Sequence, residues 1–85
     1  MRVTLLYFAS LRETLGVDRE TVDLPDDVTT AGGVRAWLRG RGGAWAAALA
    51  EGRNVRAAID QRMAGPTTSV ADGAEIAFFP PVTGG

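Results

Sequence analysis

The stretch that decides the fold is EIAFFPP, residues 75–81. Its apolar side chains fall on both faces of an extended chain, because successive residues of a strand point in opposite directions. A strand that is covered on both sides is typical of the middle of a sheet. Pro80 and Pro81 lack the N–H groups that would continue the hydrogen-bond ladder. The sequence therefore predicts a central strand over 75–79 that ends at the two prolines.

A second run of the same kind lies near the start of the chain. Residues 3–8, VTLLYF, also carry apolar side chains on both faces. Few small sheets have more than two fully covered strands, so we expect these two runs to lie side by side in the middle.

The residues between these two runs alternate between helical and extended patterns. Ser10 and Glu13 have the spacing of a capping box, which predicts a short helix from Ser10 to Leu15. The other expected elements are an outer strand over Glu20–Leu24, a helix capped by Thr29 or Thr30 with an inward stripe of Val34, Trp37 and Leu38, a helix over Trp45–Glu51, a strand over Val55–Asp60 and a short strand around Thr68–Val70. This order predicts an α+β domain of the β-grasp (ubiquitin-like) type, with a mixed sheet of about five strands and the main helix packed on one face.

The composition excludes several kinds of chemistry. The 85 residues include no cysteine and no histidine, so we expect no thiolate nucleophile and no metal site. All nine basic residues are arginines, so there is no lysine amine for Schiff-base chemistry. The formal net charge is −1 without a basic run, which argues against nucleic acid as a partner. No segment approaches the roughly 20 apolar residues of a membrane span, and the N-terminus lacks the features of a signal peptide. We therefore expect a cytoplasmic protein without a membrane partner.

The last six residues, PPVTGG, are the expected working part of the chain. We expect residues 1–79 to form the β-grasp domain and residues 80–85 to form a flexible C-terminal tail, which spans about 20 Å when extended. Gly84 and Gly85 lack Cβ atoms, so the end of the tail can thread a narrow channel. A carboxylate is a poor electrophile, so a carrier role for Gly85 requires activation, most simply as an acyl-adenylate made from ATP. Attack by sulfide would then produce a thiocarboxylate.

Residues 72–85, DGAEIAFFPPVTGG, resemble the C-terminal signature of the small-subunit family of molybdopterin synthase, ThiS-type sulfur carriers with a ubiquitin-like fold. The opening run 3–13 and the segment Trp45–Leu49 are similar to the same family, so the resemblance spans essentially the whole chain. It implies that a ubiquitin-activating-type adenylyltransferase joins AMP to Gly85 and consumes ATP. A sulfur donor, either a cysteine desulfurase or a rhodanese-like protein, would then convert the adenylate to a thiocarboxylate.

The resemblance also implies what receives the sulfur. The tail would enter the large subunit of the synthase, and the sulfur of Gly85 would pass to cyclic pyranopterin monophosphate. Two such transfers make the dithiolene of molybdopterin. Members of this family form a heterotetramer of two small and two large subunits, in which the small subunit is a non-catalytic sulfur donor with no permanently bound cofactor. The residues expected to thread into the partner are Pro80, Pro81, Val82, Thr83 and Gly84.

The family's docking surface lies on the sheet near the tail. The corresponding positions in this chain are Phe8, Arg12, Met63 and Phe79, of which Met63 departs from the usual residue type. Without the resemblance, Phe8 and Phe79 fit core packing about as well, and Arg12 fits a solvated helix surface. The pair Gly32-Gly33 is a further departure, because the family usually has better helix formers there.

Three other functions stay open from the sequence alone. The first is a sulfur carrier for thiazole or cysteine synthesis or for tRNA thiolation. The second is a protein modifier that is joined through Gly85 to lysines of other proteins. The third is a plain interaction module that uses only an exposed apolar sheet. The Phe-Phe-Pro-Pro-Val-Thr lead into the glycines favours the molybdopterin branch.

Overall fold

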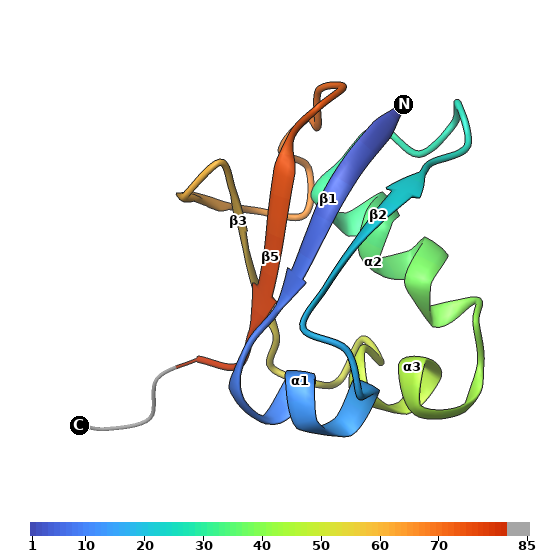
Figure 1. The fold of residues 1–85 in the computed structure, drawn as a ribbon, viewed down its shortest axis with the longest axis vertical. Helices are drawn as coiled ribbons and strands as arrows, with labels where there is room; N and C mark the ends of the chain where they lie inside the picture. Colours follow the sequence, from blue (N-terminus) through green and yellow to red (C-terminus); the bar gives the residue numbers. More distant parts are fainter. Residues whose placement is uncertain (82–85) are drawn as a thin grey trace.

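The computed structural model describes residues 1–81 as one mixed sheet with three helices. The elements in chain order are β1 (Arg2–Tyr7), α1 (Ala9–Leu15), β2 (Arg19–Asp23), α2 (Ala31–Arg39), α3 (Gly43–Ala48), β3 (Arg56–Ile59), β4 (Arg62–Ala64) and β5 (Glu75–Phe79). The strand order is β2-β1-β5-β3-β4, with β1 and β5 parallel and the other pairs antiparallel. Figure 1 shows β1 and β5 side by side in the middle, with α2 behind the sheet. The β-grasp prediction and the pairing of the two central strands are confirmed.

The core lies between the sheet and α2. Val3, Leu5 and Tyr7 of β1 point to this face and are at most 1% exposed. Val34 and Leu38 of α2, both fully buried, face them from the other layer. The remaining buried members of the cluster are Leu11, Leu24, Ala48, Leu49, Val70, Ala74, Ile76 and Phe78. The other face of β1 and β5 carries none of these residues.

The start of α2 explains the unusual Gly32. The helix is capped as predicted by Thr30, whose hydroxyl accepts the N–H of Gly33 at 3.1 Å. The N–H of Gly32 donates to the carbonyl of Pro66 at 2.8 Å. A Cβ at residue 32 would lie only 2.9 Å from that carbonyl oxygen. Glycine costs a helix about 1 kcal/mol relative to alanine, and here it allows the Pro66 loop to pack directly against the helix.

The predicted capping box at Ser10 is wrong. The helix α1 begins one residue earlier, with Phe8 as N-cap and no side-chain cap. The carbonyl of Phe8 accepts the N–H groups of Leu11 and Arg12 at 3.1 and 3.3 Å. The chain turns sharply after β1, because Ala9 has a φ of 52°. Ser10 therefore lies inside the first turn, where its side chain cannot act as the N-cap.

The predicted short strand around Thr68–Val70 is also wrong. Ser69 makes only an isolated bridge with Thr30, and the fourth strand is instead β4, which pairs with β3 in a hairpin. The hairpin turn is made by Asp60 and Gln61, with φ values of 49° and 69°. Such turns usually contain glycine, so the pair Asp-Gln gives no signal in the sequence.

The third helix is displaced from its predicted range of Trp45–Glu51. It runs from Gly43 to Ala48, and Leu49 is its C-cap. The guanidinium of Arg35 donates to the carbonyls of Leu49, Ala50 and Arg53, with Leu49 and Arg53 at 2.9 Å. These carbonyls are thereby satisfied outside a helix, and a partner so distant in sequence is not visible in the local pattern.

A polar network joins β2 to the segment between α2 and α3. The Tyr7 hydroxyl donates to Glu20 at 2.8 Å, and Arg41 donates to both oxygens of Glu20 at 2.9 and 3.0 Å. The Arg41 guanidinium also lies 4.4 Å from the ring centre of Trp45 and 5.4 Å from that of Trp37. Both tryptophans pack against the core, as predicted, but neither is fully buried.

This network predicts a loss of stability in acid. Burial raises the pKa of Glu20, but the hydrogen bonds from Arg41 and Tyr7 outweigh this effect, so the pKa lies below its ordinary value of 4.5. The stabilisation is therefore present above pH 4.5 and is lost as the pH falls through the lower pKa of the folded state. Denaturant unfolding between pH 5 and pH 3 should show a steeper fall for the wild type than for Glu20→Gln. Equal slopes would contradict the assignment.

Candidate functional site

The sheet face opposite α2 carries a continuous apolar row. The register places Leu6 beside Ala77, Ala77 beside Ala58, and Ala58 beside Met63. Directly paired residues point to the same face, so this row crosses β1, β5, β3 and β4. Met63 is 63% exposed. In the described part of the chain, no helix packs over this row.

A second apolar row lies where β1 and β5 end. The N–H of Phe8 donates to the carbonyl of Phe78 at 3.2 Å, which continues the pairing of the two strands past Tyr7. Phe79 is half-buried and points away from the core, because its neighbour Phe78 is 1% exposed on the core side. Phe8 is 46% exposed. We call the two rows together the docking face, whose members are Leu6, Phe8, Ala58, Met63, Ala77 and Phe79.

Three of the predicted interface residues, Phe8, Met63 and Phe79, thus lie on one face of the sheet. Phe8 and Met63 are the only large apolar side chains exposed among residues 1–81. Arg12 lies one helical turn after Phe8 on α1 and is exposed. The structure excludes the alternative that Phe8 and Phe79 are core residues, because neither belongs to the buried cluster. Their part in binding a partner stays a prediction.

The sequence prediction missed three members of the docking face, namely Leu6, Ala58 and Ala77. Leu6 carried a usable signal, because it alternates with the core residues Leu5 and Tyr7 and so had to face the other way. The two alanines carried none, since alanine is common on either face. Because alanine side chains are small, the sheet surface between Phe8 and Met63 stays open to close approach.

The chain leaves the sheet beside the docking face. Pro80 and Pro81 follow β5 directly, are half-buried and belong to no helix or strand. Figure 1 shows the chain leaving at the end of the sheet where β1 turns into α1. Residue 81 is the last described position, so the predictions for Val82, Thr83, Gly84 and Gly85 lie outside the described residues.

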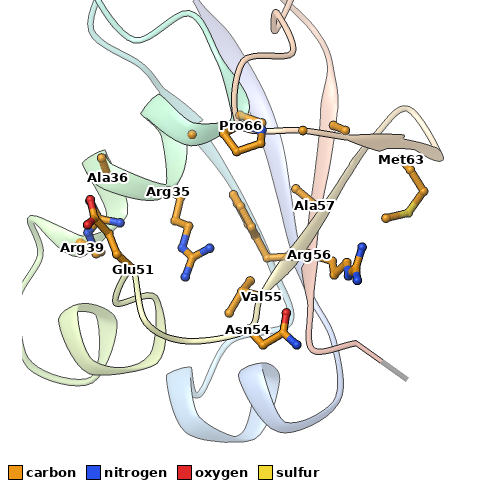
Figure 2. Close-up of a pocket in the computed structure, with 15 residues that line it drawn as sticks. Arg35, Ala36, Arg39, Glu51, Asn54, Val55, Arg56, Ala57, Met63 and Pro66 are labelled. Atoms are coloured by element: carbon orange, nitrogen blue, oxygen red, sulfur yellow. The ribbon is translucent and has the colours of Figure 1, made fainter. Parts of the chain in front are cut away.

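A hollow of about 610 Å³ lies between α2 and the hairpin of β3 and β4, and its lining reaches Arg56 and Met63 at the edge of the sheet. Figure 2 shows Arg35 reaching from α2 into this hollow, with Pro66 at its rim. Burial lowers the pKa of Arg35, with a further contribution from Arg39. Because the Arg35 guanidinium already binds three backbone carbonyls, we assign it to holding the loop after α3.

The described residues offer little other chemistry. Among residues 1–81 there is no cluster of acidic side chains that could hold a metal ion. No helix in the same range is long and apolar enough to cross a membrane.

Comparison with known proteins shows full-length relatives. A model of the ThiS family matches residues 5–85. The molybdopterin synthase sulfur carrier subunits of Haemophilus influenzae and Escherichia coli are 46% and 36% identical, over 98% of this chain and 99% of each relative. Among solved structures, the HVO 2177 protein of Haloferax volcanii is 30% identical with a TM-score of 0.80, covering 100% of this chain and 87% of that one. The small archaeal modifier protein 1 of H. volcanii is 26% identical with a TM-score of 0.77, covering 95% of this chain and 98% of that one.

The fold and site define a class of small β-grasp proteins with an exposed apolar sheet face, beside which the chain leaves the sheet at Pro80 and Pro81. Within that class, this chain belongs to the ThiS family. The family resemblance seen in residues 72–85 is confirmed.

Proposed function

We propose that this chain is the sulfur carrier of molybdopterin synthase and acts in molybdenum cofactor biosynthesis. The observation that carries the proposal is the 46% identity to the H. influenzae sulfur carrier subunit, which extends over nearly all of both chains. The docking face supports it, since a carrier must be recognised by each protein that loads or unloads it. The absence of cysteine also fits, because the sulfur must then travel on a backbone carboxylate.

The proposed chemistry takes place at Gly85. The adenylyltransferase consumes ATP, joins AMP to the carboxylate and releases pyrophosphate. The terminal sulfur of a persulfide on a cysteine desulfurase or rhodanese-like donor then attacks the acyl carbon and displaces AMP. A thiol reduces the resulting acyl disulfide, which releases the donor and leaves a thiocarboxylate. In the large subunit, the thiocarboxylate transfers its sulfur to cyclic pyranopterin monophosphate, and water restores the carboxylate. The protein itself contributes recognition and reach, with Pro80 and Pro81 directing the tail away from the sheet.

The proposed assembly is a heterotetramer of two small and two large subunits. The docking face would lie against the large subunit, with Phe8, Met63 and Phe79 as apolar contacts and Arg12 at the edge. A flat apolar surface with aromatic anchors is typical of such interfaces. The residues from Pro80 to Gly84 would then carry Gly85 into the active site of the large subunit.

Intact mass from cells tests the proposal. Loaded carrier should be heavier by about 16 Da, the difference between sulfur and oxygen, and the added mass should map to Gly85 in the C-terminal peptide. It should disappear when the adenylyltransferase is deleted. Unmodified protein in cells that make molybdopterin would contradict the proposal.

A protein-modifier function is the second candidate. It is favoured by the likeness to the small archaeal modifier protein 1, at 26% identity. The same mass experiment separates the two functions, because a modifier would be found joined through Gly85 to lysines of many other proteins. A carrier would be found mainly as free chain with the added sulfur.

A further inference from the structure

The docking face has an acidic end and a basic end. The acidic end holds Asp72, which accepts the N–H of Arg2 at 2.8 Å, and Glu75, which is paired in register with Thr4. Asp60 joins them, since its carboxylate accepts the N–H of Glu75 at 3.0 Å. Arg2 also lies at this end, but it is paired with Asp23 at 3.0 Å. The surplus charge at this end is therefore negative.

The basic end surrounds the point where the tail leaves. Arg56 of β3 is paired in register with Phe79, and Arg19 of β2 is paired with Leu6. Both side chains therefore share the docking face. Arg12 lies on α1, one turn after Phe8. Figure 2 shows Arg56 pointing away from Arg35 and toward β5.

These three arginines are uncommitted in the described part of the chain. Among residues 1–81, the ion pairs involve other arginines, namely Arg2, Arg39 and Arg41. The sequence neighbours Glu13 and Asp18 form no ion pair with Arg12 or Arg19 in that range. Unpaired arginines cost little free energy of folding when they face water, and they favour binding when a partner supplies carboxylates.

We propose that Arg56, together with Arg12 and Arg19, selects a protein partner whose apolar docking surface carries carboxylates around the opening that receives the tail. The inference rests on the proposed function and gives the chemistry of the partner. Arg56 acts as a specificity-determining residue, because it is the arginine paired directly with Phe79 at the start of the tail. An apolar face alone allows docking in two opposite directions. The difference in charge between the acidic and basic ends favours only one of these two orientations, the one that brings the tail to the opening.

The orientation matters because the tail is short. The first and last residues of the six-residue β1 are about 17 Å apart at roughly 3.3 Å per step, and the extended tail spans about 20 Å. A carrier docked in the reverse direction would use the whole tail to return to the opening. The arginines next to Phe79 therefore decide whether Gly85 reaches the acceptor.

The test compares two charge reversals in full-length protein. Arg56→Glu changes the docking face, whereas the control Arg62→Glu makes the same change on β4 at a position paired with Ile59, on the other face. Affinity for the purified large subunit from the same source is measured by calorimetry at low and high salt. We expect Arg56→Glu to weaken binding about tenfold at low salt and Arg62→Glu to leave it within about twofold. Arg56→Lys should restore most of the affinity.

The outcomes separate this inference from the proposed function. If the wild type binds and donates sulfur but Arg56→Glu and Arg62→Glu bind equally well, the arginine assignment is overturned while the carrier function stands. A wild type that neither binds the large subunit nor supports molybdopterin formation contradicts the proposed function itself. Thermal unfolding of each variant confirms that the fold is kept. High salt should reduce the difference between the wild type and Arg56→Glu, because exposed charges are screened.

Discussion

Deleting Gly85 should abolish sulfur transfer and leave the folded domain intact. The shortened chain would still end in a carboxylate, but that carboxylate would lie about 3.5 Å short of its position in the acceptor site. Misplacement of a reacting group by about 1 Å can cost roughly 100-fold in rate. We therefore expect at least a 100-fold loss, in order of magnitude, when molybdopterin formation is measured with purified activating enzyme, sulfur donor and large subunit.

Two controls define this result. Among residues 1–81 the buried core ends at Phe78, so the midpoint of thermal unfolding should not move. Gly85→Ala keeps the length of the tail and adds one methyl group, so its loss should be smaller than that of the deletion if reach is decisive. Full activity of the deletion variant would exclude Gly85 as the carrier.

The centre of the fold could be predicted from the sequence, because β1 and β5 carry their information locally. Leu5 and Leu6, like Phe78 and Phe79, are adjacent apolar residues that must point to opposite faces of a strand. Such pairs are typical of a strand that is covered on both faces. The two runs therefore identified the middle of the sheet, and the helix capped by Thr30 completed the layer.

The elements that were mispredicted depend on contacts distant in sequence. The end of α3 is set by Arg35, which binds carbonyls 14 to 18 residues away. The start of α2 was predicted correctly through its Thr30 cap, but the reason for Gly32 is its contact with Pro66, which follows β4 in the chain. The hairpin at Asp60 and Gln61 has positive φ values without glycine. No local pattern reports these contacts, so the range of α3 and the position of β4 were predicted wrongly.

The residues of the candidate site also divide into those that were predicted from the sequence and those that were missed. Phe8 and Met63 were found through a family resemblance, and the structure adds the register that places them on one face. Arg56 was missed, because a lone exposed arginine carries no signal until its pairing with Phe79 is known. Folding places few requirements on exposed residues. Their roles therefore cannot be predicted from the folding pattern of a single sequence.

Phe8→Asp should weaken binding to the large subunit by about 100-fold or more, while stability stays unchanged or rises. Phe8 is 46% exposed, so folding depends little on its ring. It is also the N-cap of α1, where its side chain makes no capping hydrogen bond. Aspartate is among the best N-cap residues and typically stabilises a helix by about 1 kcal/mol. Beneath a partner, however, the same carboxylate would be buried without a matching charge, at a cost of about 3 kcal/mol or more.

The opposite signs of these two effects make the experiment decisive. Thr67→Asp introduces the same charge at an exposed loop position away from the docking face, and it should change neither quantity by more than about 0.5 kcal/mol. Binding is measured by calorimetry and stability by denaturant unfolding. If Phe8→Asp lowers both the affinity and the stability, the ring supports folding, and the assignment of Phe8 to the docking face is wrong. If stability rises while binding is lost, Phe8 is an unfavourable N-cap for α1, and its contact with the partner explains why a phenylalanine stands there.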